Sequence, residues 1–346
     1  MIDTIKIYTQ INKAIFDKIK SLSIIKSSYN CFDGEIYYEI INDHLIGSYD
    51  SRLSIRVGCG SKYHFAEDGY YLEIEGSYHK IVRGYNSHNG YYDLNFVCKS
   101  LIELAENSYN VNLPDIDKWF LQRCDIAICF NLNNQENVKS YINSLSRCQY
   151  PRRNVKFYYD ESMYLSGSTT TLKIYNKMLE FKKHDLKNFA SNLDNSFDIY
   201  KYLDTIKGFI RFECEIKKKK LCSLFNNDKH IKVIEVNYNL LRNVWSEEFM
   251  KLLKIIKNDL EIVRSREDVY NRLNSLYKKC TANRLYNFYC CVKLIGFVDA
   301  KEKFSKSTFN RCIKQLKEAK IDFSQSYKIE EKEMFSFNPF EYKEVV

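Results

Sequence analysis

The chain has 346 residues and a formal net charge of +9, with 53 Lys and Arg against 44 Asp and Glu. This length can bury a large core in one domain or in two, and the positive balance favours a polyanionic partner. The N-terminus has no basic-then-apolar leader, and no apolar run reaches the roughly twenty residues that a membrane span needs. We therefore expect a soluble cytoplasmic protein with no membrane partner.

The cysteine pattern argues against a disulfide scaffold. The chain has 12 cysteines but no Cys-x-x-Cys pair, and Cys290 is directly followed by Cys291. Disulfide frameworks are typical of short secreted chains, and this chain is long. We expect reduced and mostly buried thiols.

Alternation of apolar and polar residues predicts strands in the first two-thirds of the chain, with helices between them. The predicted strands cover residues 3–9, 35–41, 51–58, 70–75, 123–130, 170–177 and 209–216. The predicted helices cover residues 11–22, 93–107, 135–146 and 176–188. This mixture predicts an α+β fold with a central, largely antiparallel sheet flanked by helices.

The pattern changes near residue 225. Beyond it Gly296 is the only glycine, and apolar residues recur three and four positions apart, as in Leu240, Leu241 and Val244. We place a domain boundary there, between a sheet-bearing domain of residues 1–225 and an all-helical domain of residues 226–346.

The helical domain contains a pattern similar to a helix-turn-helix. A helix over 285–294 is followed by a short turn and a second helix, which Ser305 or Ser307 could cap. The second helix has an apolar stripe of Phe309, Ile313 and Leu316. Its other face is polar and basic, with candidate DNA contacts at Lys306, Asn310, Arg311 and Lys314. The alternative is an ordinary amphipathic surface helix.

Four of the predicted strands place polar residues on one face, because residues two apart in a strand point the same way. These residues are Glu73 and Glu75, Arg123 and Asp125, Lys173, Tyr175 and Lys177, and Arg211, Glu213 and Glu215. If the strands share a sheet, carboxylates surround a tyrosine. The alternative is a merely solvated face, which is common in antiparallel sheets.

Carboxylates around a tyrosine suit metal-assisted transesterification of a phosphodiester. Two or three oxygen ligands hold Mg²⁺ or Mn²⁺, which polarises the scissile phosphate. The phenol of Tyr175 must lose its proton to attack, and a neighbouring cation such as Lys177 favours the phenolate. The resulting tyrosyl ester conserves the bond energy for rejoining.

Several segments resemble, in order, the gene II/X family of phage and plasmid replication proteins. They are Met1-Ile-Asp3, Gly58-Cys-Gly-Ser-Lys62, Leu72-Glu-Ile74, Lys80-Ile-Val-Arg-Gly-Tyr-Asn86, Arg123-Cys-Asp125, Thr171-Leu-Lys-Ile-Tyr-Asn-Lys177 and Gly208-Phe-Ile-Arg-Phe-Glu213. The likeness extends from residue 1 to about 225 and continues more loosely through 288–321. One position departs from the family: Tyr85 stands where the family has a histidine.

The resemblance implies a rolling-circle replication initiator that nicks one strand of a double-stranded origin. It would form a 5′-phosphotyrosyl link, leave a 3′-OH primer and later rejoin ends. The resemblance assigns Tyr175 as nucleophile and Asp125 and Glu213 as metal ligands, with Glu73 as a third candidate ligand. Tyr158, Tyr159 and Tyr164 are the alternatives for the nucleophile if the alignment slips.

The same resemblance suggests partners. Arg123 and Arg211, on the predicted polar face, are candidate DNA contacts. The origin duplex and the nicked single strand are the expected nucleic-acid partners; host helicase and polymerase, and a second copy of the chain, are further candidates. No strand carries a His-hydrophobic-His pair, so a nickase of this sequence should use carboxylates for its metal.

Two other functions stay open at this stage. The first is a relaxase or transposase-like nickase with the same tyrosine chemistry. The second is a non-catalytic DNA-binding regulator whose acidic face is only solvated.

Overall fold

The computed structural model describes residues 1–29, 36–45, 52–59, 69–145, 150–186, 199–226, 228–260, 266–295 and 297–321. These residues form two compact units. The first runs from Met1 to Lys251, and the second begins at Leu252.

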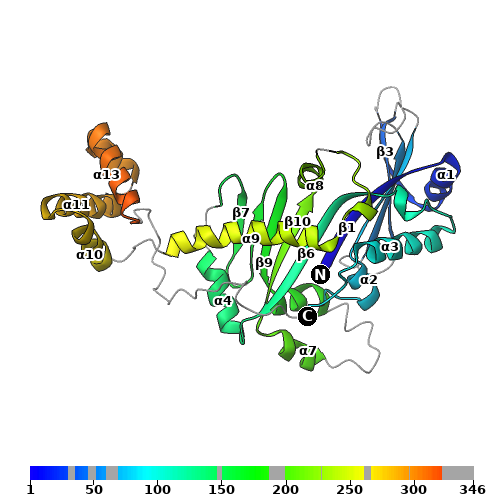
Figure 1. The fold of residues 1–346 in the computed structure, drawn as a ribbon, viewed down its shortest axis with the longest axis horizontal. Helices are drawn as coiled ribbons and strands as arrows, with labels where there is room; N and C mark the ends of the chain where they lie inside the picture. Colours follow the sequence, from blue (N-terminus) through cyan, green and yellow to red (C-terminus); the bar gives the residue numbers. More distant parts are fainter. Residues whose placement is uncertain are drawn as a thin grey trace. The chain divides into compact units, whose positions relative to one another are not determined.

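The first unit is built on a ten-stranded sheet (Figure 1). Its strands are β1 (Ile2–Ile11), β2 (Ile24–Tyr29), β3 (Ile36–Leu45), β4 (Leu53–Cys59), β5 (Tyr70–Gly76), β6 (Phe120–Asn131), β7 (Asn154–Tyr158), β8 (Ser162–Ser166), β9 (Thr170–Asn176) and β10 (Phe209–Lys217). Their order is β2-β3-β4-β5-β1-β6-β10-β9-β8-β7, and each pair of neighbours in this order is antiparallel. The predicted α+β class and the antiparallel sheet are confirmed.

All seven predicted strands are present, and three strands were not predicted: β2, β7 and β8. In β7 the aromatic residues Phe157 and Tyr158 are adjacent and so point to opposite faces. The contrast between an apolar and a polar face is therefore weak in that segment, and alternation does not reveal the strand.

Helices pack against the sheet of the first unit. The helices of the first unit are α1 (Lys13–Leu22), α2 (Tyr78–Arg83), α3 (Leu94–Tyr109), α4 (Gln135–Ser144), α5 (Lys177–Glu180), α7 (Ile199–Ile206), α8 (Lys218–Leu224) and the first part of α9 (Tyr238–Leu260). Tyr141 of α4 and Phe249 of α9 both pack against Phe212 on the apolar face of β10. Figure 1 shows α9 crossing the strands on this side. The apolar residues that alternate with the polar ones in β6, β9 and β10 form this core.

The first unit extends beyond the boundary predicted near residue 225. Trp245 is 2% exposed, and its indole Nε1 donates a hydrogen bond to the backbone oxygen of Phe212 at 3.1 Å. Phe249 also packs on the sheet, 5.1 Å from Phe212 between ring centroids. Residues 228–251 therefore complete the core of the sheet, and the compact unit ends at Lys251. The change to helical periodicity near residue 225 shows where strands give way to helices. The first of these helical residues still belong to the sheet-bearing unit, so the unit ends later, at Lys251.

The second unit is helical, as predicted. It contains α10 (Arg266–Leu276), α11 (Lys279–Ile295), α12 (Phe297–Lys303) and α13 (Lys306–Glu318), which share a core that includes Leu285, Phe288, Phe309 and Leu316. The predicted second helix is α13, and Ser305 caps it by accepting a hydrogen bond from the backbone N–H of Thr308. The segment between the two predicted helices is more than a short turn, because it contains the short helix α12.

Two further expectations concern the whole described part of the chain. None of its helices is both long and apolar enough to cross a bilayer. The cysteines within the described ranges are all free thiols, and Cys98, Cys124 and Cys214 are among the buried ones.

Candidate active site

Apart from Lys177, the predicted polar residues share one face of the sheet. Strand β1 inserts between β5 and β6, and β6, β10 and β9 follow in that order. The register pairs Asp125 with Glu215 across β6 and β10, and it pairs Glu213 with Lys173 and Arg211 with Tyr175 across β10 and β9. Directly paired residues lie on the same face. Asp125 and Glu215, which lie far apart in the sequence, are thus direct neighbours across two adjacent strands.

Tyr175, Glu213 and Asp125 come together at the centre of this face. The phenol Oη of Tyr175 donates a hydrogen bond to Oε2 of Glu213 at 3.0 Å. The ammonium of Lys173 lies 2.6 Å from Oε1 of Glu213 and 3.5 Å from Oδ2 of Asp125. The side chains of Asp125 and Glu213 are at most 5% exposed. A buried phenol therefore faces a carboxylate that can accept its proton.

Asp125 is held from the other side by Arg123. The guanidinium donates two hydrogen bonds to the two oxygens of Asp125, at 2.8 and 2.6 Å, and a third to Glu75 at 2.9 Å. Such a bidentate pair fixes the carboxylate in one orientation. Burial raises the pKa of Asp125 to about 6, although Lys173 and Arg123 oppose the shift. Arg123, predicted as a DNA contact, is engaged inside the site.

The cation beside Tyr175 is Arg211. Its guanidinium carbon lies 6.0 Å from the centroid of the Tyr175 ring, and the two residues are cross-strand partners. Burial raises the pKa of Tyr175 well above its usual value, and Arg211 is the main group that opposes this. Lys177, predicted for this role, begins α5, and its buried ammonium pairs with Glu180 at 2.6 Å. The strand ends at Asn176, so Lys177 no longer follows the alternation.

A second buried polar cluster supports Arg211. Its Nη1 donates to the backbone oxygen of Ser87 at 2.9 Å, and its Nη2 lies 3.3 Å from Oδ1 of Asp3. Asp3 is also 3.4 Å from Nε2 of His79 and accepts a hydrogen bond from Ser77 at 3.3 Å. Burial lowers the pKa of His79 to about 3, so this histidine is neutral at physiological pH. The contacts with Ser87 and Asp3 therefore hold the Arg211 side chain in position.

Sequence reasoning did not identify His79 as part of the site. The available signal was its position just before the Lys80–Asn86 segment. Asn86 completes the cluster, because its side-chain oxygen lies 3.2 Å from Nε2 of His79 and its amide donates to Glu180 at 2.9 Å. Tyr85, which replaces the family's histidine, packs edge-on against Phe181 and Tyr202. That position has a packing role in this chain.

Two carboxylates of this site are the candidates to hold a hard divalent cation. Asp125 and Glu213 supply carboxylate oxygens on neighbouring strands, and the ammonium of Lys173 already lies between them. Mg²⁺ commonly uses one or two carboxylates together with phosphate oxygens and water. Among the described residues no group of three His, Cys, Asp or Glu side chains forms a metal cage. Glu73, the third predicted ligand, contacts Lys6 at 3.3 Å and Arg56 at 3.7 Å, two strands away from Asp125.

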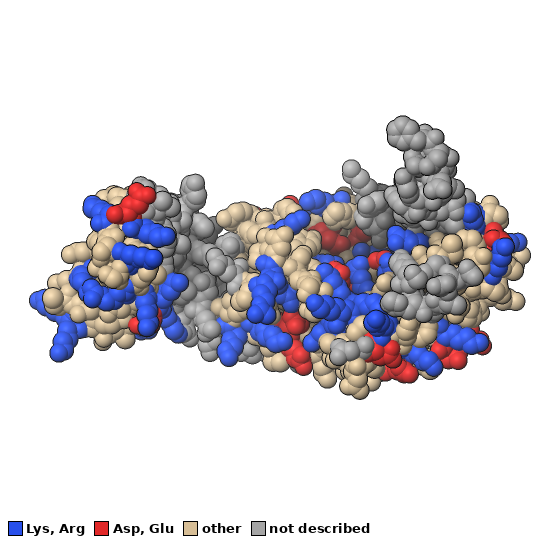
Figure 2. All heavy atoms as spheres, turned by 90° about the horizontal axis from the view of Figure 1, so that it is seen from above, with Lys and Arg blue, Asp and Glu red and all other residues tan. Residues whose placement is uncertain are grey.

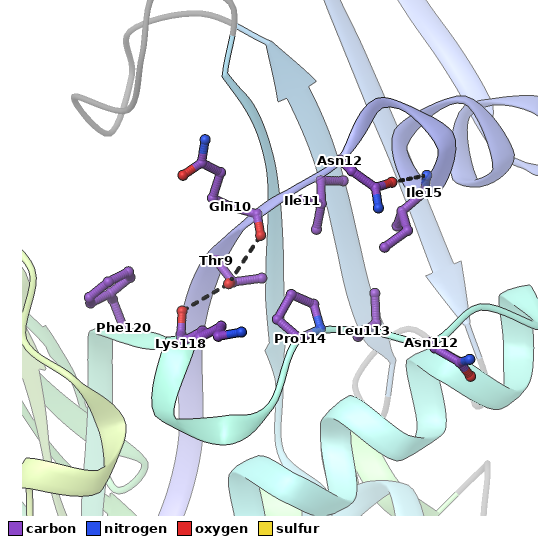
Figure 3. Close-up of a pocket in the computed structure, with 10 residues that line it drawn as sticks. All are labelled: Thr9, Gln10, Ile11, Asn12, Ile15, Asn112, Leu113, Pro114, Lys118 and Phe120. Atoms are coloured by element: carbon purple, nitrogen blue, oxygen red, sulfur yellow. Dashed lines mark hydrogen bonds between the residues drawn. The ribbon is translucent and has the colours of Figure 1, made fainter.

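A surface hollow elsewhere in the first unit does not contain these residues. It has a volume of about 660 Å³ and lies where β1 ends, beside the segment before β6 (Figure 3). Its lining is Thr9, Gln10, Ile11, Asn12, Ile15, Asn112, Leu113, Pro114, Lys118 and Phe120. No residue predicted for the site is among them, so this hollow is separate from the candidate active site.

The second unit presents the predicted basic helix face to solvent. Lys306, Asn310, Arg311 and Lys314 of α13 are exposed, whereas Phe309 and Leu316 on the opposite side are buried. Figure 2 shows Lys and Arg side chains crowding the visible surface of this unit, with few acidic ones between them. The face has the charge and exposure that a phosphate-contacting surface needs.

Comparison with known proteins identifies the class. Residues 1–239 match a phage family described as the N-terminal part of the gene II replication-associated protein. The match covers well over half of the chain, so the chain belongs to this replication-associated family. The resemblance to the gene II/X replication proteins is thereby confirmed.

Two further comparisons add little. A solved rolling-circle replication initiator protein from Geobacillus stearothermophilus aligns with 66% of this chain and 78% of its own, at 12% identity and a TM-score of 0.27. A superposition that loose supports no argument about the site. None of the curated proteins matches the chain.

Proposed function

We propose that this protein initiates rolling-circle replication by nicking one strand of a double-stranded origin with Tyr175. The hydrogen bond from the Tyr175 phenol to Glu213 carries the proposal, because it supplies a nucleophile and a proton acceptor in contact. Membership of a replication-associated family supports the biological setting. The exposed basic face of α13 supports binding of the origin duplex.

The proposed nicking step is a transesterification at the scissile phosphorus. Oη of Tyr175 attacks the phosphorus, and its proton passes to Oε2 of Glu213. The bond from phosphorus to the 3′ oxygen breaks, and that oxygen takes a proton from water to become the 3′-OH primer. The 5′ end stays on Tyr175 as a phosphotyrosyl ester, and the reverse reaction rejoins ends. Burial raises the pKa of the phenol, so the acceptor carboxylate and the Arg211 guanidinium are both needed.

Asp125 and Glu213 are the proposed ligands for Mg²⁺ or Mn²⁺, which would polarise the scissile phosphate and offset its developing charge. Lys173 adds positive charge at the same place. Glu213 and Asp125 raise the pKa of Lys173 more than burial lowers it, so the ammonium stays charged. The proposed role of Lys173 is to neutralise the phosphate and to hold both carboxylates in position.

A nicking assay across pH tests this function. Supercoiled plasmid carrying the origin should become nicked circles in the presence of Mn²⁺, whereas a non-catalytic regulator would produce none. Asp125 must be ionised to bind the metal ion, and burial raises its pKa to about 6. At Mn²⁺ concentrations below saturation, where protons compete with the metal for this carboxylate, the single-turnover rate should therefore fall by up to about tenfold per pH unit below that value. A rate that stays constant from pH 7 down to pH 5 would exclude a required Asp125 carboxylate.

The basic face of α13 yields a separate prediction. Replacing Arg311 and Lys314 together with Ala should weaken binding of the origin duplex and reduce the slope of log affinity against log salt by about 1.8, or 0.9 per lost phosphate contact. Filter binding at several salt concentrations measures both effects. The matched control replaces Lys13 and Lys18, exposed on α1, and removes the same charge. An equal slope change in both variants would show an unspecific charge effect.

A further inference from the structure

The polar face of the sheet continues past Tyr175 to the outermost strand. The register aligns Tyr175 of β9 with Ser162 of β8 and Tyr158 of β7 in one row. In the next row Lys173 aligns with Tyr164 and Lys156. Directly paired residues share a face. Tyr158, Tyr164 and Lys156 therefore lie on the same side of the sheet as the nucleophile and Glu213.

These outer residues are open to solvent. Tyr158 is 50% exposed, Lys156 is exposed and Tyr164 is half-buried. The two tyrosine rings lie 6.1 Å apart between centroids and stand perpendicular. Lys156 has no ion pair among the residues that the structure describes. The alternate residues of β8, Met163 and Leu165, are instead fully buried on the other face.

We propose that Tyr158, Tyr164 and Lys156 bind the single-stranded DNA next to the scissile phosphate. Exposed aromatic rings stack on bases of any sequence, and lysines contact the phosphates between them. Bases inside a duplex already stack on one another, so such rings favour an unpaired strand. This inference rests on the proposed function, because it takes Tyr175 to mark the cleavage point.

The distances suit a few nucleotides. Neighbouring strands lie about 4.8 Å apart, so β7 is about 10 Å from β9. A stacked strand advances about 3.4 Å per nucleotide, which places Tyr158 roughly three nucleotides from the phosphate at Tyr175. Tyr164 of β8 has Lys173 as its neighbour on β9 and Lys156 as its neighbour on β7. A backbone that crosses these strands would meet a cation, an aromatic ring and a second cation in turn.

The test measures binding without cleavage. In the full-length Tyr175→Phe background, Tyr158 and Tyr164 are both replaced with Ala, and fluorescence anisotropy follows a labelled single-stranded oligonucleotide of about ten nucleotides. Affinity for the single strand should fall about tenfold for each ring removed, while affinity for a duplex of the same sequence stays unchanged. Separately, Lys156→Ala should reduce the salt slope by about 0.7.

Tyr159→Ala is the matched control. Tyr159 is 64% exposed and adjacent to Tyr158, but its ring packs on Phe157, whose cross-strand partner Met163 lies on the buried face. Unchanged single-strand affinity in the double variant, or an equal loss in the control, would overturn the proposal. Because no cleavage is involved, either result leaves the chemistry of Tyr175 untouched. Conversely, a loss of single-strand binding would stand even if Tyr175 were not the nucleophile.

Discussion

Replacing Tyr175 with Phe should abolish covalent capture of DNA, with a fall of at least about 10³-fold. The substitution removes the one atom that forms the phosphotyrosyl bond. The phenyl ring keeps its position beside the Arg211 guanidinium, and Glu213 keeps its ion pair with Lys173. The loss of one hydrogen bond should cost about 1 kcal/mol of stability. Denaturing gel electrophoresis of the protein with labelled origin DNA measures the covalent adduct.

Controls separate this role from a general effect. Tyr158→Phe and Tyr164→Phe remove the hydroxyl groups of the nearby alternatives and should retain capture, because the proton acceptor Glu213 contacts the phenol of Tyr175 and the two outer rings remain for stacking. Origin-duplex binding by Tyr175→Phe should match that of the unmodified protein. Full capture by Tyr175→Phe would refute the assignment, and loss of capture in Tyr164→Phe alone would transfer it to that residue.

Glu213→Gln should reduce the nicking rate by about 10²- to 10⁴-fold, the usual range for loss of a general base. Glutamine has nearly the same size but cannot take the Tyr175 proton. It also has a single acceptor oxygen for the two donors that Glu213 now serves, Lys173 and Tyr175. The variant should in addition need more Mn²⁺ to reach its maximal rate, because one carboxylate ligand is lost. Single-turnover nicking at several Mn²⁺ concentrations measures both effects.

Glu215→Gln is the matched control for this prediction. Glu215 lies on the same strand and the same face, but its carboxylate is 3.8 Å from Arg123 and 4.0 Å from Lys217 rather than beside Tyr175. Its nicking rate should stay near that of the unmodified protein. Equal losses in the two variants would mean that the face acts through its total charge. A Glu213→Gln enzyme with the normal rate and metal requirement would remove Glu213 from the proposed chemistry.

The local pattern of the sequence was enough to predict much of the fold. Side chains in a strand alternate between faces, so the polar side of β6, β9 and β10 could be predicted without knowing where the strands lie. Helical spacing likewise predicted α13, a serine cap at Ser305 or Ser307, and a basic face opposite the apolar stripe; the structure shows that Ser305 is the cap. Both are properties of neighbouring residues in the chain. Aromatic residues on both faces of β7 removed that signal, and the strand was missed.

Which strands are neighbours is a different matter, since hydrogen-bond register joins segments far apart in the sequence. Only the tertiary structure places Asp3 of β1 against Arg211 of β10, and His79 behind both. It also decides that Arg211 rather than Lys177 lies at Tyr175, because β9 ends at Asn176 and the chain turns into α5. Likewise it sets Glu73 two strands away from Asp125. The sequence by itself determined which residues share a face of each strand, because this depends on local periodicity. Only the tertiary structure decided which residues they contact, because this depends on the pairing of strands that are far apart in the sequence.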